Sequence, residues 1–176
     1  MSGFATIGHS IRSPQTVIDM LREAGVRLLV DVRSFPKSRT NPDFNLDSFS
    51  RLLADHQLGY RHMPALGGRR PKQPGVDDDL NRFWRVRSFH NYADYALGED
   101  FQQALAELER LGSAQVVATM CSEAVWWRCH RRIITDYLLF HGHEVRHLMA
   151  PGRIDPARPS EGAHLREDGT VVYPAE

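Results

Sequence analysis

A single α/β domain, built as a three-layer sandwich around a mainly parallel sheet of about four to five strands, is predicted by three observations. Short apolar runs alternate with amphipathic stretches of helical spacing between residues 4 and 148. The apolar runs show little alternation of polar and apolar residues, which is typical of strands covered on both faces. The chain has 176 residues, of which 41% are hydrophobic and 25% charged, and this suits one full-sized core. The expected architecture is Rossmann-like.

The individual elements follow from local signals. Ser13 and Pro14 are typical of a helix start, and Gly25 and Gly112 are expected to end helices. Residues 64–90 carry several Pro and Gly interruptions and predict a long loop with at most a short helix. Strands are expected at 4–7, 27–32, 60–63, 116–120 and 144–148. Helices are expected at 14–24, around 49–53, at 91–97, at 101–111, and from the turn at 121–126 through residue 140.

Two segments of the chain are expected to differ in organisation. Residues 1–150 form the α/β domain that carries all of the motifs, and residues 151–176 form a Pro- and Gly-rich tail. A short hairpin is expected in this tail, with its turn at Asp168 and Gly169.

The charges cancel overall but not locally. Lys and Arg number 22, as do Asp and Glu, which disfavours coating of nucleic acid by bulk electrostatics. Residues 33–72 nevertheless hold eight basic and three acidic side chains. No apolar run approaches the roughly 20 residues of a membrane span, no secretory signal is recognised at the N-terminus, and two cysteines are too few for a disulfide framework. We therefore expect a cytoplasmic protein without a membrane partner.

Polar and reactive side chains follow the predicted strands. Because ligands bind beyond the carboxyl ends of parallel strands, these residues are expected to form one site. The candidate catalytic residues are His9, Asp31, Cys121, Glu123 and His130. The candidate substrate-binding residues are Ser10, Arg12, Arg33, Ser34, Ser38, Arg39, Tyr60, Gly67, Gly68, Cys129 and Arg131.

The last predicted helix orients part of this site. Cys129 and His130 lie one turn before the apolar pair Ile133 and Ile134, so they are expected to face inward at the N-terminus of the helix. A helix N-terminus attracts anions and lowers the pKa of a nearby thiol. Arg132 and Asp136 are four residues apart on another face and predict a surface ion pair.

Several motifs in order resemble a bacterial family, catalogued as domain of unknown function 488. They are Thr6-Ile7-Gly8-His9-Ser10, Leu29 through Arg39, Tyr60-Arg61-His62 with Leu66-Gly67-Gly68, Cys121-Ser122-Glu123, and Cys129-His130-Arg131. The resemblance extends from about Thr6 to Leu148 and implies a cytosolic α/β domain whose site lies at these positions. It implies no particular reaction.

A weaker likeness is to rhodanese-type sulfur transferases. Residues 29–34, Leu-Val-Asp-Val-Arg-Ser, are similar to the second-strand motif of those enzymes, and Cys121 ends a later strand. The loop after Cys121 departs from their pattern, because it carries Glu123 and two tryptophans in place of small residues. Shared architecture alone is an analogy.

The leading functional hypothesis is an enzyme, a hydrolase or a transferase, that acts on an anionic substrate such as a nucleotide or a nucleic-acid base. Arg33, Arg39 and Arg131 would hold the anion, and Cys121 would be a nucleophile activated by His130 and the helix end. The other candidate residues, among them Glu123, would transfer protons.

Four alternatives remain open at the level of the sequence. The first is a zinc or iron site built from Cys121, Cys129 and a histidine, His9 or His130. The second is a non-catalytic module that binds a nucleotide or nucleic acid. The others are rhodanese-like sulfur transfer and a redox sensor that uses a disulfide between the two cysteines. The sequence requires no cofactor and leaves the oligomeric state open.

Overall fold

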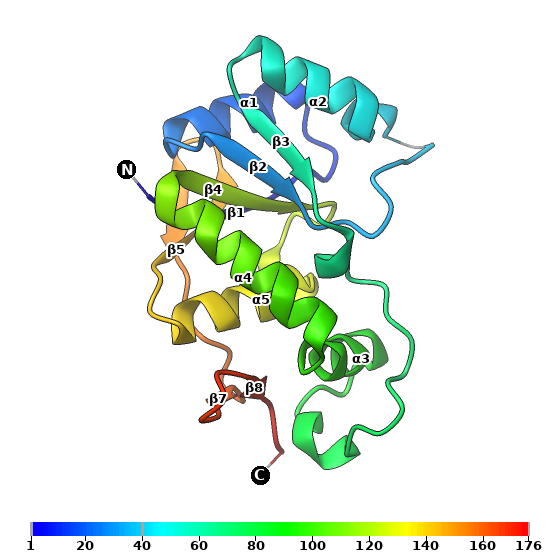
Figure 1. Ribbon diagram of the computed structural model, residues 1–176. Helices are drawn as coiled ribbons and strands as arrows, with labels where there is room; N and C mark the ends of the chain where they lie inside the picture. The colour runs from blue at the N-terminus through cyan, green and yellow to red at the C-terminus, as the bar shows by residue number, and fades with distance from the viewer. Residues whose placement is uncertain (1, 40, 176) are drawn as a thin grey trace.

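Six strands form one sheet, and five of them are parallel. The computed structural model describes residues 2–39 and 41–175. The strand order is β3-β2-β4-β1-β5-β6, and β6 alone runs antiparallel to its neighbour, at the edge of the sheet (Figure 1). The strands are β1 (Gly3–Gly8), β2 (Leu28–Asp31), β3 (Gly59–His62), β4 (Val116–Cys121), β5 (Val145–Ala150) and β6 (Arg153–Pro156). The predicted α/β sandwich is confirmed.

Helices cover both faces of the sheet. The α-helices are α1 (Pro14–Glu23), α2 (Leu46–Asp55), α3 (Arg87–Ala96), α4 (Glu99–Ala114) and α5 (Arg131–Phe140). Short 3-10 helices are η1 (Pro42–Phe44), η2 (Pro64–Leu66), η3 (Asp78–Asn81) and η4 (Trp126–Arg128). Helices α1 and α2 lie on one face, and α3, α4 and α5 lie on the other. None of the helices in the described ranges is both long and apolar enough to cross a membrane.

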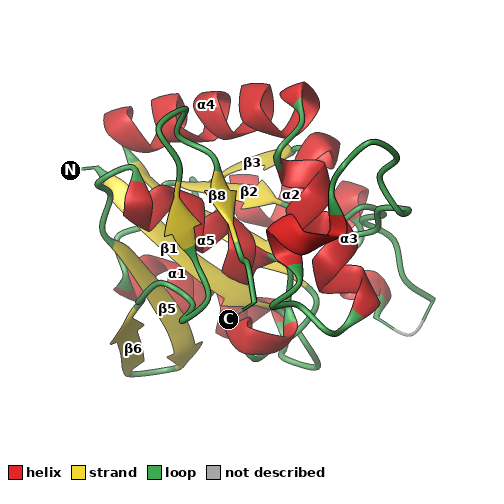
Figure 2. Ribbon diagram, turned by 90° about the horizontal axis from the view of Figure 1, so that it is seen from below, coloured by secondary structure: helices red, strands yellow, loops and turns green. Residues whose placement is uncertain are grey.

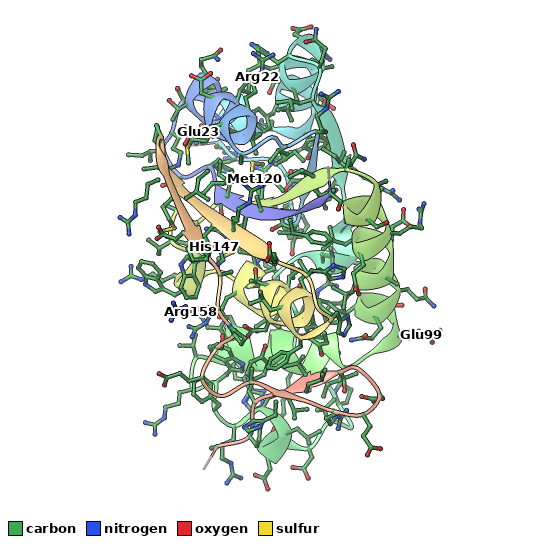
Figure 3. The ribbon with its side chains drawn as sticks, turned by 90° about the vertical axis from the view of Figure 1, so that its left-hand side faces the viewer. Arg22, Glu23, Glu99, Met120, His147 and Arg158 are labelled. Carbon is green, nitrogen blue, oxygen red and sulfur yellow. The ribbon has the colours of Figure 1, made fainter. Side chains whose placement is uncertain are left out.

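Alternate residues of the strands fill two apolar layers. In β1, Phe4 belongs to the layer under α3, α4 and α5, whereas Ala5 and Ile7 belong to the layer under α1 and α2. Met120 of β4 lies in the second layer, while Glu99 at the start of α4 projects outward (Figure 3). Parallel strands buried on both faces explain why the sequence shows apolar runs without alternation.

Residues 151–175 contribute to the sheet and the core. They supply β6 and the predicted hairpin, which consists of β7 (His164–Leu165) and β8 (Val171–Val172). The hairpin lies on the face of α4 and α5 (Figure 2), and Tyr173 is fully buried. Strand β6 was not predicted from the sequence because a short, polar edge strand carries no apolar pattern.

Two local predictions were wrong. Helix α4 passes through Gly112 and ends at Ala114, and the ring of Phe4 occupies the space where a side chain at residue 112 would lie. Asp136 is buried rather than paired with Arg132 at the surface. It accepts hydrogen bonds from the backbone N–H of Ser160 and the hydroxyl of Tyr173, because the C-terminal segment covers α5.

Candidate active site

The chain order of the sheet creates a crevice between β1 and β4. These strands are neighbours, and their last paired residues are Gly8 and Cys121. The connection after β1 crosses one face through α1 toward β2, whereas the connection after β4 crosses the opposite face through α5 toward β5. Ligands of open α/β sheets bind at such a switch point, beyond the carboxyl ends of the strands.

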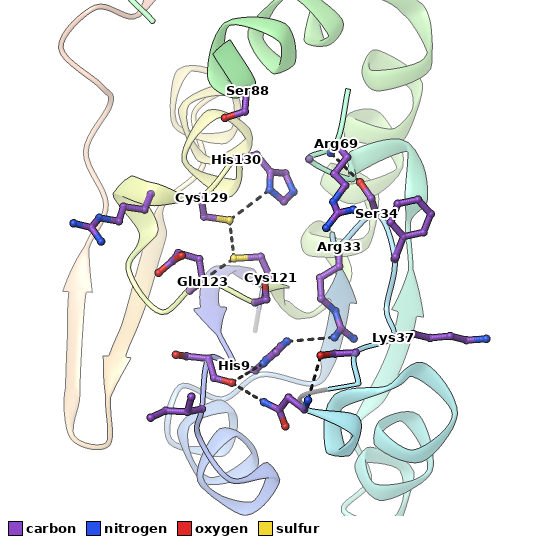
Figure 4. Close-up of a pocket in the computed structure, with 18 of the residues that line it drawn as sticks. His9, Arg33, Ser34, Lys37, Arg69, Ser88, Cys121, Glu123, Cys129 and His130 are labelled. Atoms are coloured by element: carbon purple, nitrogen blue, oxygen red, sulfur yellow. Dashed lines mark hydrogen bonds between the residues drawn. The ribbon is translucent and has the colours of Figure 1, made fainter. Parts of the chain in front are cut away.

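A cavity of about 1040 Å³ opens at this crevice (Figure 4). Many of the predicted site residues lie together there. Those that line it are His9, Ser10, Arg33, Ser34, Ser38, Gly68, Cys121, Glu123, Cys129 and His130. In the close-up, the two cysteines, Glu123 and His130 lie across the cavity from Arg33, Ser34 and Arg69.

A buried ion pair supports one wall of the cavity. The carboxylate of Asp31, at the end of β2, accepts hydrogen bonds from Nε and Nη2 of Arg33, with Nη2 at 2.6 Å. It also accepts from the backbone N–H of Arg33 and the hydroxyl of Tyr60. Burial and the charge of Asp31 raise the pKa of Tyr60, which therefore stays protonated. Asp31 itself is inaccessible to solvent, so it positions Arg33 rather than a substrate.

His9 continues this wall. Its ring stacks on Phe44, with centroids 4.4 Å apart. Nδ1 donates to the carbonyl of Ser10 at 3.0 Å, which leaves Nε2 to accept from Nη1 of Arg33 at 3.3 Å. Burial and the Arg33 cation lower the pKa of His9, although its contact with Ser10 opposes this. His9 is therefore neutral, and Nε2, its unprotonated ring nitrogen, accepts a hydrogen bond from Arg33.

Two thiols lie on the opposite wall, at the ends of β4 and η4. The sulfur of Cys129 is 2.6 Å from the sulfur of Cys121, and both residues are buried. Nη1 of Arg131 donates to the Cys121 sulfur at 2.7 Å. Burial raises the pKa of Cys121, but the hydrogen bond from Cys129 and the charge of Arg131 outweigh it and lower the pKa to about 7. Cys129 keeps its proton, since burial and the neighbouring Cys121 raise its pKa.

Arg131 is the unusual member of this group. It is 1% exposed, and no carboxylate of the described residues lies within ion-pair distance of it. Its guanidinium donates to the carbonyls of Glu123 and Ala124, which hold the loop after β4. An unpaired buried cation is costly, so an anionic Cys121 is its natural counter-charge. Arg131 was expected from the sequence to contact substrate, but it lies behind the thiol of Cys121.

His130 contacts Cys129 and not Cys121. Its Nε2 donates to the carbonyl of Val32 at 2.7 Å, and its Nδ1 lies 3.5 Å from the sulfur of Cys129. Burial lowers the pKa of His130 to about 4, although the carbonyl contact opposes the shift. The ring is therefore neutral. The prediction that His130 activates Cys121 was wrong, because Arg131 and Cys129, and not His130, contact the Cys121 sulfur.

Two glycines allow these walls to approach each other. A Cβ atom on Gly8 would lie 1.7 Å from the carbonyl oxygen of Glu123, the same oxygen that accepts from Arg131. A Cβ atom on Gly68 would lie 2.5 Å from Nδ1 of His130. Close packing within the site therefore explains why Gly8 and Gly68, which belong to the motifs named above, have no side chain.

Other predicted residues lie behind or away from the cavity. Gly67 packs against Ser34, and the hydroxyl of Tyr60 donates to Asp31 rather than lining the cavity. Arg12 donates to the carbonyls of Gly8 and Met149, and Arg39 is exposed; neither residue lines the cavity.

Part of the cavity rim lies outside the candidate residues selected from the sequence. Phe35 is 67% exposed and Ile11 is 97% exposed, and both line the opening. Phe35, Lys37 and Ser122 belong to the family motifs but were not selected as candidates. The other unselected lining residues are Asn41, Arg69, Ser88, Phe89 and Arg128. The basic excess in residues 33–72 was a signal for Lys37 and Arg69. No signal pointed to Ser88 and Phe89, which reach the cavity because α3 docks there after the long loop.

The thiol pair is a poor fit for the zinc or iron site considered above. The Arg131 cation, which donates to the sulfur of Cys121, repels a metal ion at this position. Among the described residues, no group of three potential metal ligands with atoms within 4.8 Å of one another includes a cysteine.

The comparisons with known proteins give a family and no function. No curated protein matches the chain, and no solved structure does. The family model described as domain of unknown function DUF488 matches residues 13–138, which include Arg33, Cys121 and Cys129 of the cavity but not His9. The chain therefore belongs to the DUF488 family.

Proposed function

We propose that the protein is a cysteine-dependent enzyme that acts on an anionic substrate, a nucleotide or a nucleic-acid base, in the cavity beyond β1 and β4. The observation that carries this proposal is the contact between Cys121, which lines the cavity, and the buried Arg131 behind it, which has no carboxylate partner among the described residues. A thiol held as a thiolate near neutral pH is a strong nucleophile.

The charges around the opening support an anionic substrate. Lys37, Arg69 and Arg128 line the cavity, and Glu123 is its only lining carboxylate among the described residues. Phe35 lies on the same rim, with the guanidinium of Arg69 5.5 Å from its ring centre. A basic rim with an exposed aromatic ring suits a phosphate and a base stacked beside it.

The residues can divide the chemistry between them. The Cys121 thiolate forms a bond to an electrophilic atom of the substrate, and the leaving group departs with its bonding electrons. Glu123, which is exposed and lines the cavity, supplies the proton to that group and later removes one from an incoming water or acceptor. Arg33 orients the anion from the opposite wall. A free thiol pair also suits the reducing cytoplasm, which we propose as the location.

The second thiol favours one alternative reaction. In a rhodanese-like transfer, Cys121 takes the outer sulfur of thiosulfate and releases sulfite. The sulfur of Cys129 lies 2.6 Å from that of Cys121, so Cys129 can then attack the inner sulfur of this persulfide, form a disulfide with Cys121 and release hydrosulfide. Incubation of a Cys129→Ser variant with thiosulfate would therefore add one sulfur atom to the mass of Cys121.

The leading proposal is tested by binding and turnover measured together. Adenosine monophosphate should bind at least about tenfold tighter than adenosine, because a charge-assisted phosphate contact adds at least 1.4 kcal/mol. Arg69→Gln should abolish this preference, whereas Arg153→Gln, at an exposed position outside the cavity, should leave it intact. Cys121→Ser should stop conversion of nucleotides or short oligonucleotides, followed by mass spectrometry, without weakening their binding. Equal affinity for the two ligands, or turnover by the serine variant, would contradict the proposal.

A further inference from the structure

The acidic run Asp77-Asp78-Asp79 does not line the active-site cavity, but its middle residue, Asp78, faces the buried His90. Asp78 begins η3, and His90 and Asp94 are four residues apart on one face of α3. Their potential ligand atoms, one from each residue, all lie within 4.8 Å of one another. Two ligands four residues apart on a helix, completed by a third from another segment, is a common way to hold a metal ion.

The geometry of the three side chains is close to that of a metal site. Nε2 of His90 lies 3.4 Å from Oδ2 of Asp94 and 3.9 Å from Oδ1 of Asp78. A tetrahedral zinc ion with bonds of about 2.0–2.1 Å separates its ligand atoms by about 3.4 Å. The side chain of Asp78 is 59% exposed, so it is free to make the small remaining movement.

His90 supplies an independent reason to expect a ligand. The residue is 7% exposed, and its Nε2 has no hydrogen-bond partner within the part of the chain that the structure describes. This buried nitrogen is directed at two carboxylates without a hydrogen bond to either. Buried polar atoms nearly always have a partner, so a bound ion is the natural partner of Nε2 of His90.

Asp94 is held in place as metal-binding carboxylates usually are. Its second oxygen, Oδ1, accepts a hydrogen bond from the side-chain amide of Asn81 at 2.7 Å. The amide oxygen of Asn81 accepts from the backbone N–H of Tyr173 at 3.0 Å. Such outer contacts orient the ligand oxygen and are a regular feature of metal sites.

We infer that Asp78, His90 and Asp94 bind a divalent transition-metal ion, with zinc the best match to one imidazole and two carboxylates. Water completes the coordination on the exposed side of Asp78. The ion would join η3 to α3 and so fix the end of the loop at residues 64–90. Ser88 and Phe89 of α3 line the active-site cavity, which places the ion in a structural role beside the opening.

Zinc titration of the full chain tests this inference. After removal of metal with a chelator, calorimetry should show one Zn²⁺ bound per chain. Asp78→Asn and His90→Gln should each weaken binding by about tenfold or more, in line with losses at other metal sites. Asp79→Asn, at a neighbouring exposed position, is the matched control and should bind as the unaltered protein does.

A double variant, Cys121→Ser with Cys129→Ser, separates this site from the thiols. It should keep the zinc stoichiometry, and Co²⁺ in the unaltered protein should show no thiolate absorption band. Absence of zinc binding, binding unchanged in Asp78→Asn, or binding lost in the double cysteine variant would overturn the inference. Because Asp78 is exposed, its variant decides the matter even if His90→Gln does not fold. None of these results bears on nucleophilic catalysis by Cys121.

Discussion

Arg131→Met should slow the alkylation of Cys121 at pH 7 by up to about 50-fold. With a pKa of about 7, half of the Cys121 thiol is ionised at this pH. Without the guanidinium, the pKa should move toward the ordinary value of 9.0, at which about one thiol in a hundred is ionised. Methionine fills a similar volume without charge. The rate is measured by mass spectrometry of the peptide that contains Cys121 after timed exposure to iodoacetamide.

Arg128→Met is the control for this prediction. Arg128 lines the same cavity but is exposed, and it makes no hydrogen bond to the sulfur of Cys121. Its loss should therefore change the alkylation rate far less than the loss of Arg131. Similar rates in the unaltered protein and in a folded Arg131→Met variant would mean that Arg131 does not hold the thiolate.

Asp31→Asn should lower the free energy of unfolding by about 3–5 kcal/mol. The change leaves the buried Arg33 without its counter-charge, because the carboxylate accepts from both the side chain and the backbone of Arg33. The side chains of the pair are 0% and 8% exposed, so solvent cannot compensate the cation. Urea unfolding at neutral pH, followed by circular dichroism, measures the loss.

Two further variants show whether the unpaired charge causes that loss. Tyr60→Phe removes one hydrogen bond to Asp31 and keeps the ion pair, so it should cost only about 1–2 kcal/mol. Adding Arg33→Met to Asp31→Asn removes the stranded cation and should restore much of the lost stability. A double variant no more stable than Asp31→Asn alone would show that packing, rather than charge, is responsible.

The fold and the gathering of many candidate residues around one cavity could be predicted because both follow from the parallel sheet. Apolar runs without alternation indicate strands buried on both faces, and the carboxyl ends of such strands meet at one edge. His9 and Cys121, more than 100 positions apart in the sequence, therefore share a cavity. The edge strand β6 escaped prediction because its polar residues carry no such pattern.

The roles of individual charged residues could not be predicted in the same way. Sequence position places Asp31, Arg33 and Arg131 at the carboxyl edge of the sheet, but it does not show which side chains turn inward. The chain after β2 bends so that Arg33 folds back onto Asp31, and α5 begins where Arg131 reaches the end of β4. Asp31 and Arg131 therefore support the reactive groups from behind, whereas Arg33 lines the cavity. The rim is formed by loops whose course depends on the whole fold.

The pH dependence of Cys121 alkylation in the unaltered protein is the most direct test of a thiolate at the cavity wall. Arg131 and Cys129 favour the charged form, so the rate should rise with pH to half of its maximum near pH 7. Cys129 should stay unmodified over the same range, because it keeps its proton. A midpoint near the ordinary value of 9.0, or a Cys129 that reacts first, would contradict the account.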